Sequence, residues 1–152
     1  MAGLAGVASA GLAFDAVVRP GQLASVIDVA AAVPVLRIIV DHLGNPRPGP
    51  EAARWRETMA ALALLPNVAV KLSGLTGLAR DLGVGALRPM VDAVLRGFGA
   101  HRVMFGSDWP VCLLAGDFDD ATALAATLTA DLDSAERVDV FCGAAAQWYH
   151  LT

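Results

Sequence analysis

The chain has 152 residues, a formal net charge of −4 and a hydrophobic content of 56%, with 17% charged residues. This length suffices for one domain with a substantial core, and the scattered basic residues argue against nucleic-acid binding. Because no apolar stretch reaches the roughly 18 uninterrupted residues of a membrane span, the apolar excess indicates strands buried on both faces and Ala-rich helices.

Short apolar runs alternate with segments of helical periodicity, and Gly or Pro marks most junctions. We predict the end of a helix first, then strands at Leu12–Val18, Leu36–Asp41, Val68–Leu72 and Val103–Gly106, and helices at Gln22–Val33, Glu51–Leu65, Leu87–Phe98, Asp119–Thr129 and Ser134–Tyr149, the last with Ser134 as its cap. Strands alternating with helices predict right-handed crossovers and a parallel α/β sheet. We expect one domain over residues 1–152.

Cysteine usage and the start of the chain bear on its compartment. Cys112 and Cys142 lie thirty positions apart with no CxxC motif. A disulfide is possible, but two buried free thiols in a reducing cytoplasm are the preferred interpretation. The uncharged first fourteen residues lack the basic region of a signal peptide. Their abrupt start inside an element suggests a piece of a longer protein.

Alternation along the strands predicts which side chains point away from the helices. In the third strand, Val68, Val70 and Leu72 share one face, so Lys71 and Ser73 share the other. Lys71 is also the only lysine, against ten arginines. We expect one inward surface near the carboxyl ends of the strands, formed by Asp15, Arg19, His42, Lys71, Ser73 and Asp108. Asp41 is ambiguous, because it neighbours His42 on the opposite parity.

Each of these residues has a chemical and a structural interpretation. His42 can polarise a carbonyl, move a proton or bind a metal, or it can simply hydrogen-bond a loop. Asp108 can bind a divalent metal and take a proton from water, or it can cap the loop that follows it. Lys71 can bind a substrate carboxylate or carbonyl oxygen, or form a salt bridge to Asp15.

Two further positions stay open in the same way. Asp15 and Arg19 can contact substrate, although a structural ion pair is the preferred interpretation. Trp109 can line a pocket or close the top of the fold. The first strand is not followed by a Gly-rich phosphate loop, which argues against a small flavodoxin-like domain.

Three motifs in order resemble those of one known family: IVDHLGNP at residues 39–46, VAVKLSGL at 68–75 and MFGSDWPV at 104–111. The chain resembles the amidohydrolase-related (amidohydrolase 2) family of metal-dependent TIM-barrel hydrolases, and within it the sugar-lactonase branch. The tail VFCGAAAQWY at 140–149 is similar to the closing helix of that family, with Ala144 where the family usually has Asn. The resemblance covers essentially the whole chain.

This resemblance implies a (β/α)₈ barrel, with these four strands as the fifth to eighth and the site at their carboxyl ends. Asp108 then matches a metal ligand or general base, and His42 a histidine near the scissile carbonyl. Lys71, Ser73, Trp109 and Arg19 are the expected substrate-binding residues. The implied reaction is attack of an activated water on a lactone or related carbonyl, with a divalent metal, possibly zinc.

The sequence departs from the family in length and in one motif. The His-x-His pair of the family's first strand is absent, and a full barrel takes about 250 residues. A half barrel leaves unpaired edges and exposed apolar surface. We therefore expect a partner, either a complementary half-barrel or a second copy. The alternative to an incomplete hydrolase is a non-catalytic module that associates through these edges.

Overall fold

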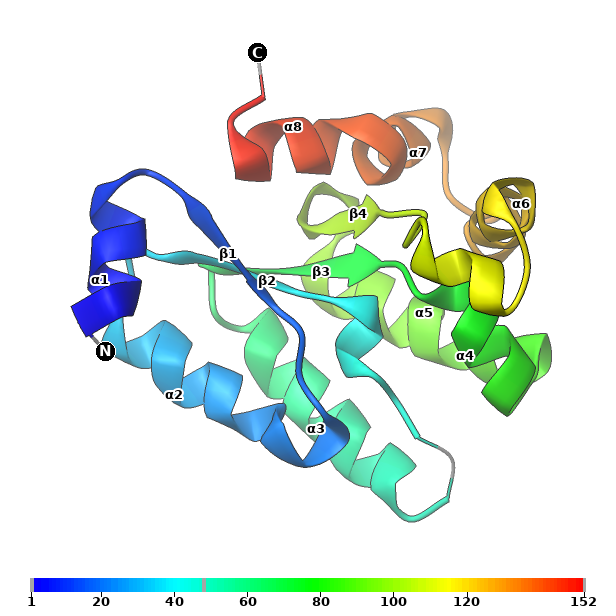
Figure 1. Cartoon of the computed structure of the whole chain (residues 1–152), viewed down its shortest axis with the longest axis horizontal. Coiled ribbons are helices and arrows are strands. Elements are labelled where there is room, and N and C mark those ends of the chain that lie inside the picture. The colour runs from blue at the N-terminus through cyan, green and yellow to red at the C-terminus, as the bar shows by residue number, and fades with distance from the viewer. Residues whose placement is uncertain (1, 48, 152) are drawn as a thin grey trace.

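The computed structural model describes residues 2–47 and 49–151 (Figure 1). The strands are β1 (Ala13–Ala16), β2 (Arg37–Val40), β3 (Val68–Leu72) and β4 (Val103–Phe105), and the helices are α1 (Ala2–Ser9), α2 (Ala24–Ala32), α3 (Glu51–Ala63), α4 (Leu75–Leu82), α5 (Val84–Phe98), α6 (Phe118–Leu128), α7 (Ser134–Val138) and α8 (Ala144–Tyr149). A π-helical segment, Asp139–Gly143, joins α7 to α8.

The four strands form one parallel sheet in the order β1-β2-β3-β4. Asp15 pairs in register with Ile39, Val40 with Val70, and Lys71 with Met104. Each strand is therefore added beside its predecessor, as in a barrel, without the reversal of strand order that defines a doubly wound sheet. This order confirms the predicted parallel α/β architecture and rules out the flavodoxin-like alternative.

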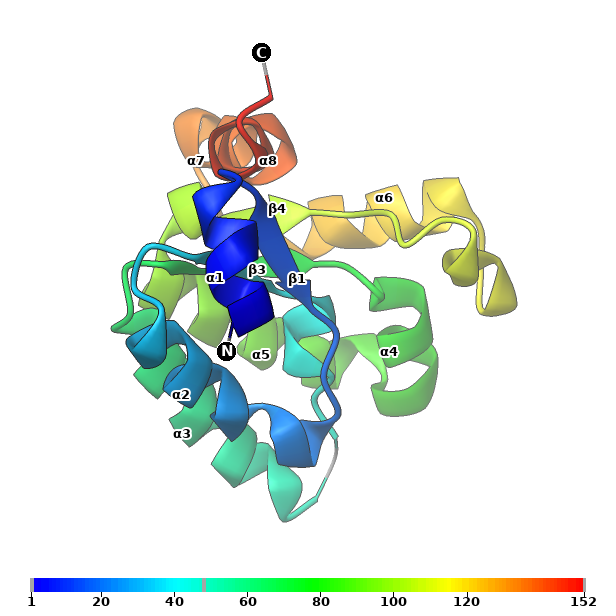
Figure 2. The same cartoon turned by 60° about the vertical axis from the view of Figure 1, so that its left-hand side comes forward.

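Helices α2, α3 and α5 cover one face of the sheet (Figures 1 and 2). Side chains of alternate strand residues pack against them in the main core, among them Ile38, Val40, Val68, Val70, Leu72 and Val103. These side chains are completely buried. Burying a side chain of this size contributes about 1.5–3 kcal/mol, so this face stabilises the chain most.

Helix α8 lies on the opposite face of the sheet from α2, α3 and α5 (Figure 2). Its residues Ala144 and Trp148 form a second, smaller buried cluster with Ile39, Ala69 and Met104. These three strand residues have the opposite parity to the main core. The second face is thus partly covered by the end of the chain itself.

Most predicted elements are present, with shorter strands than predicted. Strand β3 has the predicted bounds, whereas β1 lacks the outer residues of the predicted Leu12–Val18 run. Helix α4 was not among the predicted helices. Helix α5 begins at Val84, three residues before the predicted start at Leu87.

Two local predictions were wrong. The N-cap before α7 is Asp133, not Ser134: its carboxylate accepts hydrogen bonds from the backbone N–H groups of Ala135 and Glu136. Both cysteines are free thiols, but only Cys112 is buried. Cys142 is exposed because it lies on the outer side of the π-helical segment, whose neighbour Val140 faces the core.

Within the described part of the chain, no helix is both long and apolar enough to cross a membrane.

The cap assignment can be tested by mutation. Asp133→Ala should lower the free energy of unfolding by about 1 kcal/mol, since an N-cap carboxylate that bonds two backbone N–H groups is lost. Ser134→Ala should change it by less than about 0.5 kcal/mol. Urea unfolding followed by circular dichroism measures both, and a larger loss for Ser134→Ala would contradict the assignment.

Candidate functional site

The carboxyl ends of β2, β3 and β4 bring polar side chains together. His42 follows β2, Ser73 follows β3 and Asp108 lies in the loop after β4. Because the strands are parallel, these residues meet at one edge of the sheet. Of the six residues that the sequence predicts on the inward surface, five belong to two contacting groups at or below this edge. Arg19 belongs to neither group.

His42 lies in an unusual turn. The backbone is left-handed at His42, Leu43, Gly44 and Asn45, with φ between 52° and 71°. Non-glycine residues in this region cost about 1–3 kcal/mol each and cluster at functional sites. The turn is held by Trp55, whose Nε1 donates to the carbonyl of Leu43 at 2.7 Å, and by Asn45, whose side chain donates to the carbonyl of Val18 at 2.8 Å.

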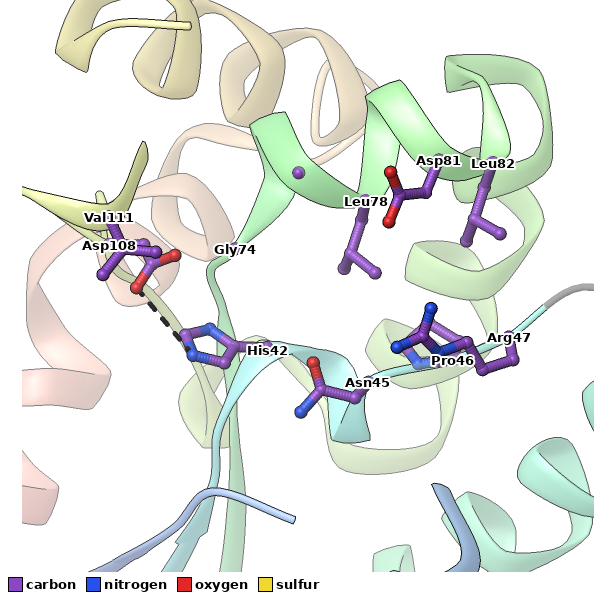
Figure 3. A pocket seen from close by; sticks show the side chains of 11 residues that line it. His42, Asn45, Pro46, Arg47, Gly74, Leu78, Asp81, Leu82, Asp108 and Val111 are labelled. Atoms are coloured by element: carbon purple, nitrogen blue, oxygen red, sulfur yellow. Dashed lines mark ion pairs between the residues drawn. The ribbon is translucent and has the colours of Figure 1, made fainter. Parts of the chain in front are cut away.

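The first contacting group is His42, Ser73 and Asp108. Nδ1 of His42 lies 2.9 Å from Oγ of Ser73, and Nε2 lies 3.8 Å from Oδ1 of Asp108 (Figure 3). The second distance is too long for a hydrogen bond, so an oxygen atom near both groups can interact with each. Gly74 makes room for the ring, because a Cβ there would lie 3.0 Å from Nδ1 of His42.

His42 and Asp108 line a pocket of about 460 Å³. Its far end is formed by Asp81 of α4 and by Arg47 of the loop after β2, and Asn45 lies between the two ends (Figure 3). None of Arg47, Asn45 and Asp81 was predicted from the sequence as a site residue. The pocket therefore combines a histidine–carboxylate pair with charged and amide groups that can bind hydroxyls.

The second contacting group is an ion cluster on the inward face of the sheet. Nζ of Lys71 lies 2.7 Å from Oδ2 of Asp15 and 3.1 Å from Oδ1 of Asp41. The contact with Asp41 lacks hydrogen-bond geometry, and this buried oxygen accepts no hydrogen bond within the described residues. Asp41 thus faces Lys71 with the parity of Ile39, which settles the ambiguity in the sequence. The salt-bridge interpretation of Lys71 and Asp15 is also confirmed.

Tyr149 at the end of α8 completes this cluster. Its hydroxyl donates to Oδ1 of Asp15 at 2.6 Å. Burial and this hydrogen bond raise the pKa of Tyr149 to about 12. Burial alone would lower the pKa of Lys71, but its contacts with Asp15, Tyr149 and Asp41 outweigh burial and raise it above the usual value. Lys71 is therefore a permanent cation, unsuited to act as a base.

All four residues expected to bind substrate lie outside the pocket lining, Lys71 because it belongs to the ion cluster. Ser73 is 2% exposed and lies beneath the His42 ring. Trp109 is 65% exposed. Arg19 is exposed and forms no ion pair within residues 2–47 and 49–151, so the structural pairing of Asp15 with Arg19 was wrong. Lys71, and not Arg19, forms the ion pair with Asp15.

The donor set does not fit a complete zinc site. Zinc in proteins takes three or four side-chain ligands, whereas His42 and Asp108 provide two. In the described ranges, no three His, Cys, Asp or Glu side chains are placed to share a metal.

A parallel sheet in sequential order, with polar side chains gathered at the carboxyl ends of its strands, is typical of TIM barrels, whose active sites lie at those ends. The amidohydrolase family profile matches residues 2–151. The chain belongs to this family. It forms four strands and their helices, which correspond to half of an amidohydrolase TIM barrel.

The relatives are about twice as long. L-fucono-1,5-lactonase of Burkholderia multivorans is 39% identical over 151 residues, which make up 91% of this chain and 51% of the relative. The lactonase of Burkholderia ambifaria is 39% identical over 92% of this chain and 50% of its own length. A crystal structure of an amidohydrolase from Burkholderia multivorans with bound zinc superposes with a TM-score of 0.92 at 35% identity, over 99% of this chain and 57% of that one.

The close approach of Gly74 to His42 predicts a contrast between two glycines. Gly74→Ala should destabilise the protein by about 1–2 kcal/mol, since φ is 64° and a Cβ would push against the ring. Gly77→Ala should stabilise it by about 0.5 kcal/mol, because a Cβ in α4 meets open space. Urea unfolding of the two variants checks the prediction, and equal effects would contradict it.

Tyr149 is the only tyrosine, so ultraviolet absorbance of the phenolate reports its ionisation directly. We expect a pKa of about 12 in the folded chain. Asp15→Asn should lower it, because an acceptor and a negative charge are removed, and Lys71→Met should raise it, because a cation is removed. Shifts in the same direction would contradict the cluster.

The raised pKa also predicts a pH dependence of stability. The neutral phenol stabilises the fold, and this contribution is complete below the unfolded pKa near 10 and is lost as the pH rises through about 12. Lys71 changes in the same direction, because its folded pKa is also raised.

Proposed function

We propose that this chain is the C-terminal half of a lactonase that becomes active on joining a complementary half-barrel. The observation that carries the proposal is the His42–Asp108 pair, which faces the pocket at the carboxyl edge of the sheet. Membership of the amidohydrolase family and 39% identity to two L-fucono-1,5-lactonases support a sugar lactone as substrate.

In the proposed reaction, Asp108 accepts a proton from water as the water oxygen attacks the lactone carbonyl carbon. His42 donates a hydrogen bond to the carbonyl oxygen and stabilises the negative charge that develops there. The ring C–O bond then breaks, and the leaving oxygen takes up the proton to give the open hydroxy acid. Asn45, Arg47 and Asp81 are placed to bind the sugar hydroxyls.

The remaining expected site residues depend on the missing half in this proposal. Arg19 and Trp109 lie on exposed loops after β1 and β4, which flank the open side of the sheet. Substrate contact by these two residues requires a second half to close the site. Lys71 supplies a fixed positive charge on the inward face, through its cluster with Asp15 and Asp41.

The surface of the chain supports association with a partner. Strands β1 and β4 pair on one side only. Leu12, Phe14 and Val17 are exposed along β1, and Val111 and Leu114 in the segment after β4. A groove of about 420 Å³, lined mainly by apolar residues, runs between β1 and α2. Such apolar edges are typical of surfaces that other protein covers.

The test is a single-chain chimera. The half of the Burkholderia multivorans lactonase that this chain does not cover is fused to residues 1–152 and assayed with L-fucono-1,5-lactone. We expect turnover by the chimera and none by the chain alone. Asp108→Asn should lower kcat by about 10²–10⁴-fold, as expected for loss of a catalytic base.

Asp131→Asn serves as the matched control, because this carboxylate is 92% exposed, pairs with Arg88 and does not line the pocket. It should leave turnover unchanged. A folded chimera without turnover, or with turnover insensitive to Asp108→Asn, would refute the proposal. Stable self-association of the chain without turnover in the chimera would favour the non-catalytic module instead.

A further inference from the structure

We propose that Ser73 is a positioning residue that holds the neutral His42 ring in the tautomer protonated on Nε2. This inference deepens the proposed function, on which it rests for the role of the ring. It replaces the expectation that Ser73 binds substrate, since Ser73 is buried and does not line the pocket.

The Ser73 hydroxyl has one hydrogen to donate and can accept two hydrogen bonds. It accepts one from the backbone N–H of His42 at 3.2 Å. Its second partner is Nδ1 of the same residue, at 2.9 Å. If Nδ1 carried a hydrogen, the buried hydroxyl hydrogen would need another acceptor, and the hydrogen bonds of the described residues include none for it.

Buried polar groups are almost always hydrogen-bonded. The arrangement that satisfies every atom has the Ser73 hydroxyl donating to Nδ1, and the ring hydrogen on Nε2. This hydrogen then faces Asp108, whose Oδ1 lies 3.8 Å from Nε2. A lone pair on Nε2 would instead be repelled by the carboxylate. Both ends of the ring therefore favour the same tautomer.

The surrounding backbone limits the ring to this orientation. The left-handed φ of 54° at His42 directs its side chain toward Ser73, and Gly74 leaves the space that the ring fills. Gly106 leaves space for Ser73 in the same way, since a Cβ at Gly106 would lie 3.2 Å from Cβ of Ser73. The functional consequence is that His42 presents a hydrogen-bond donor to the pocket, which leaves Asp108 as the base.

Nitrogen-15 NMR of labelled histidine in the 152-residue chain tests the tautomer directly, at a pH where the ring is neutral. Long-range proton–nitrogen spectra distinguish a protonated ring nitrogen from an unprotonated one, and His42→Gln assigns the signals among the three histidines. In the wild type, we expect the Nε2 signal of a protonated nitrogen and the Nδ1 signal of an unprotonated one.

Ser73→Ala should move both nitrogen signals part of the way toward averaged values, because only the preference set by Asp108 is left, and Ser73→Thr should restore the wild-type pattern. Trp55→Phe is the structural control: it removes a hydrogen bond from the same turn without touching the ring, and should keep the tautomer. Asp108→Asn should also keep it.

A wild-type ring protonated on Nδ1 would overturn the assignment, as would nitrogen signals of Ser73→Ala identical to those of the wild type. If Ser73→Ala does not fold, loss of the tautomer in Asp108→Asn would overturn it instead, by showing that Asp108 sets the proton. None of these results depends on turnover. An inactive chimera refutes the proposed function and leaves the tautomer assignment intact.

Discussion

The packing of α2, α3 and α5 against one face of the sheet determines where every polar side chain of the strands can go. Ile38, Val40 and Val70 fill that face, and a charge placed among them would lose its hydration without a partner. Because strand side chains alternate, Asp15 and Lys71 must face the other way. The ion cluster and the pocket both follow from this single constraint.

The His42 turn shows how the fold departs from simple alternation to build a site. By parity with Ile38 and Val40, the His42 side chain would point into the helices. Four consecutive left-handed residues turn it toward Ser73 and the pocket instead. The conformational cost is offset by the hydrogen bonds from Trp55 and Asn45, which come from a helix and from the turn itself.

The strand order and most helices could be predicted because hydrophobic periodicity directly reflects burial. The orientation of side chains beyond the end of a strand could not be predicted, since alternation no longer applies there. Asp41 was therefore left ambiguous, and Ser73 was predicted to contact substrate. Helix α4 was not predicted, because its 8 residues are fewer than the about 11–18 over which helical periodicity is recognised. The contact of Tyr149 with Asp15, 134 residues away, has no local signal in the sequence. Arg47 and Asp81 were not predicted either, because no local pattern in the sequence marks them as pocket residues.

The Lys71 cluster has a practical consequence for chemical labelling. Lys71 carries the sole side-chain amine of the chain, and its contacts with Asp15, Asp41 and Tyr149 hold that amine as an ammonium ion. Acylating reagents attack the free amine, which requires both deprotonation and access. Acylation of this residue therefore demands that the cluster opens first. In a chain with a single lysine, the rate of modification would record how often the inward face of the sheet comes apart.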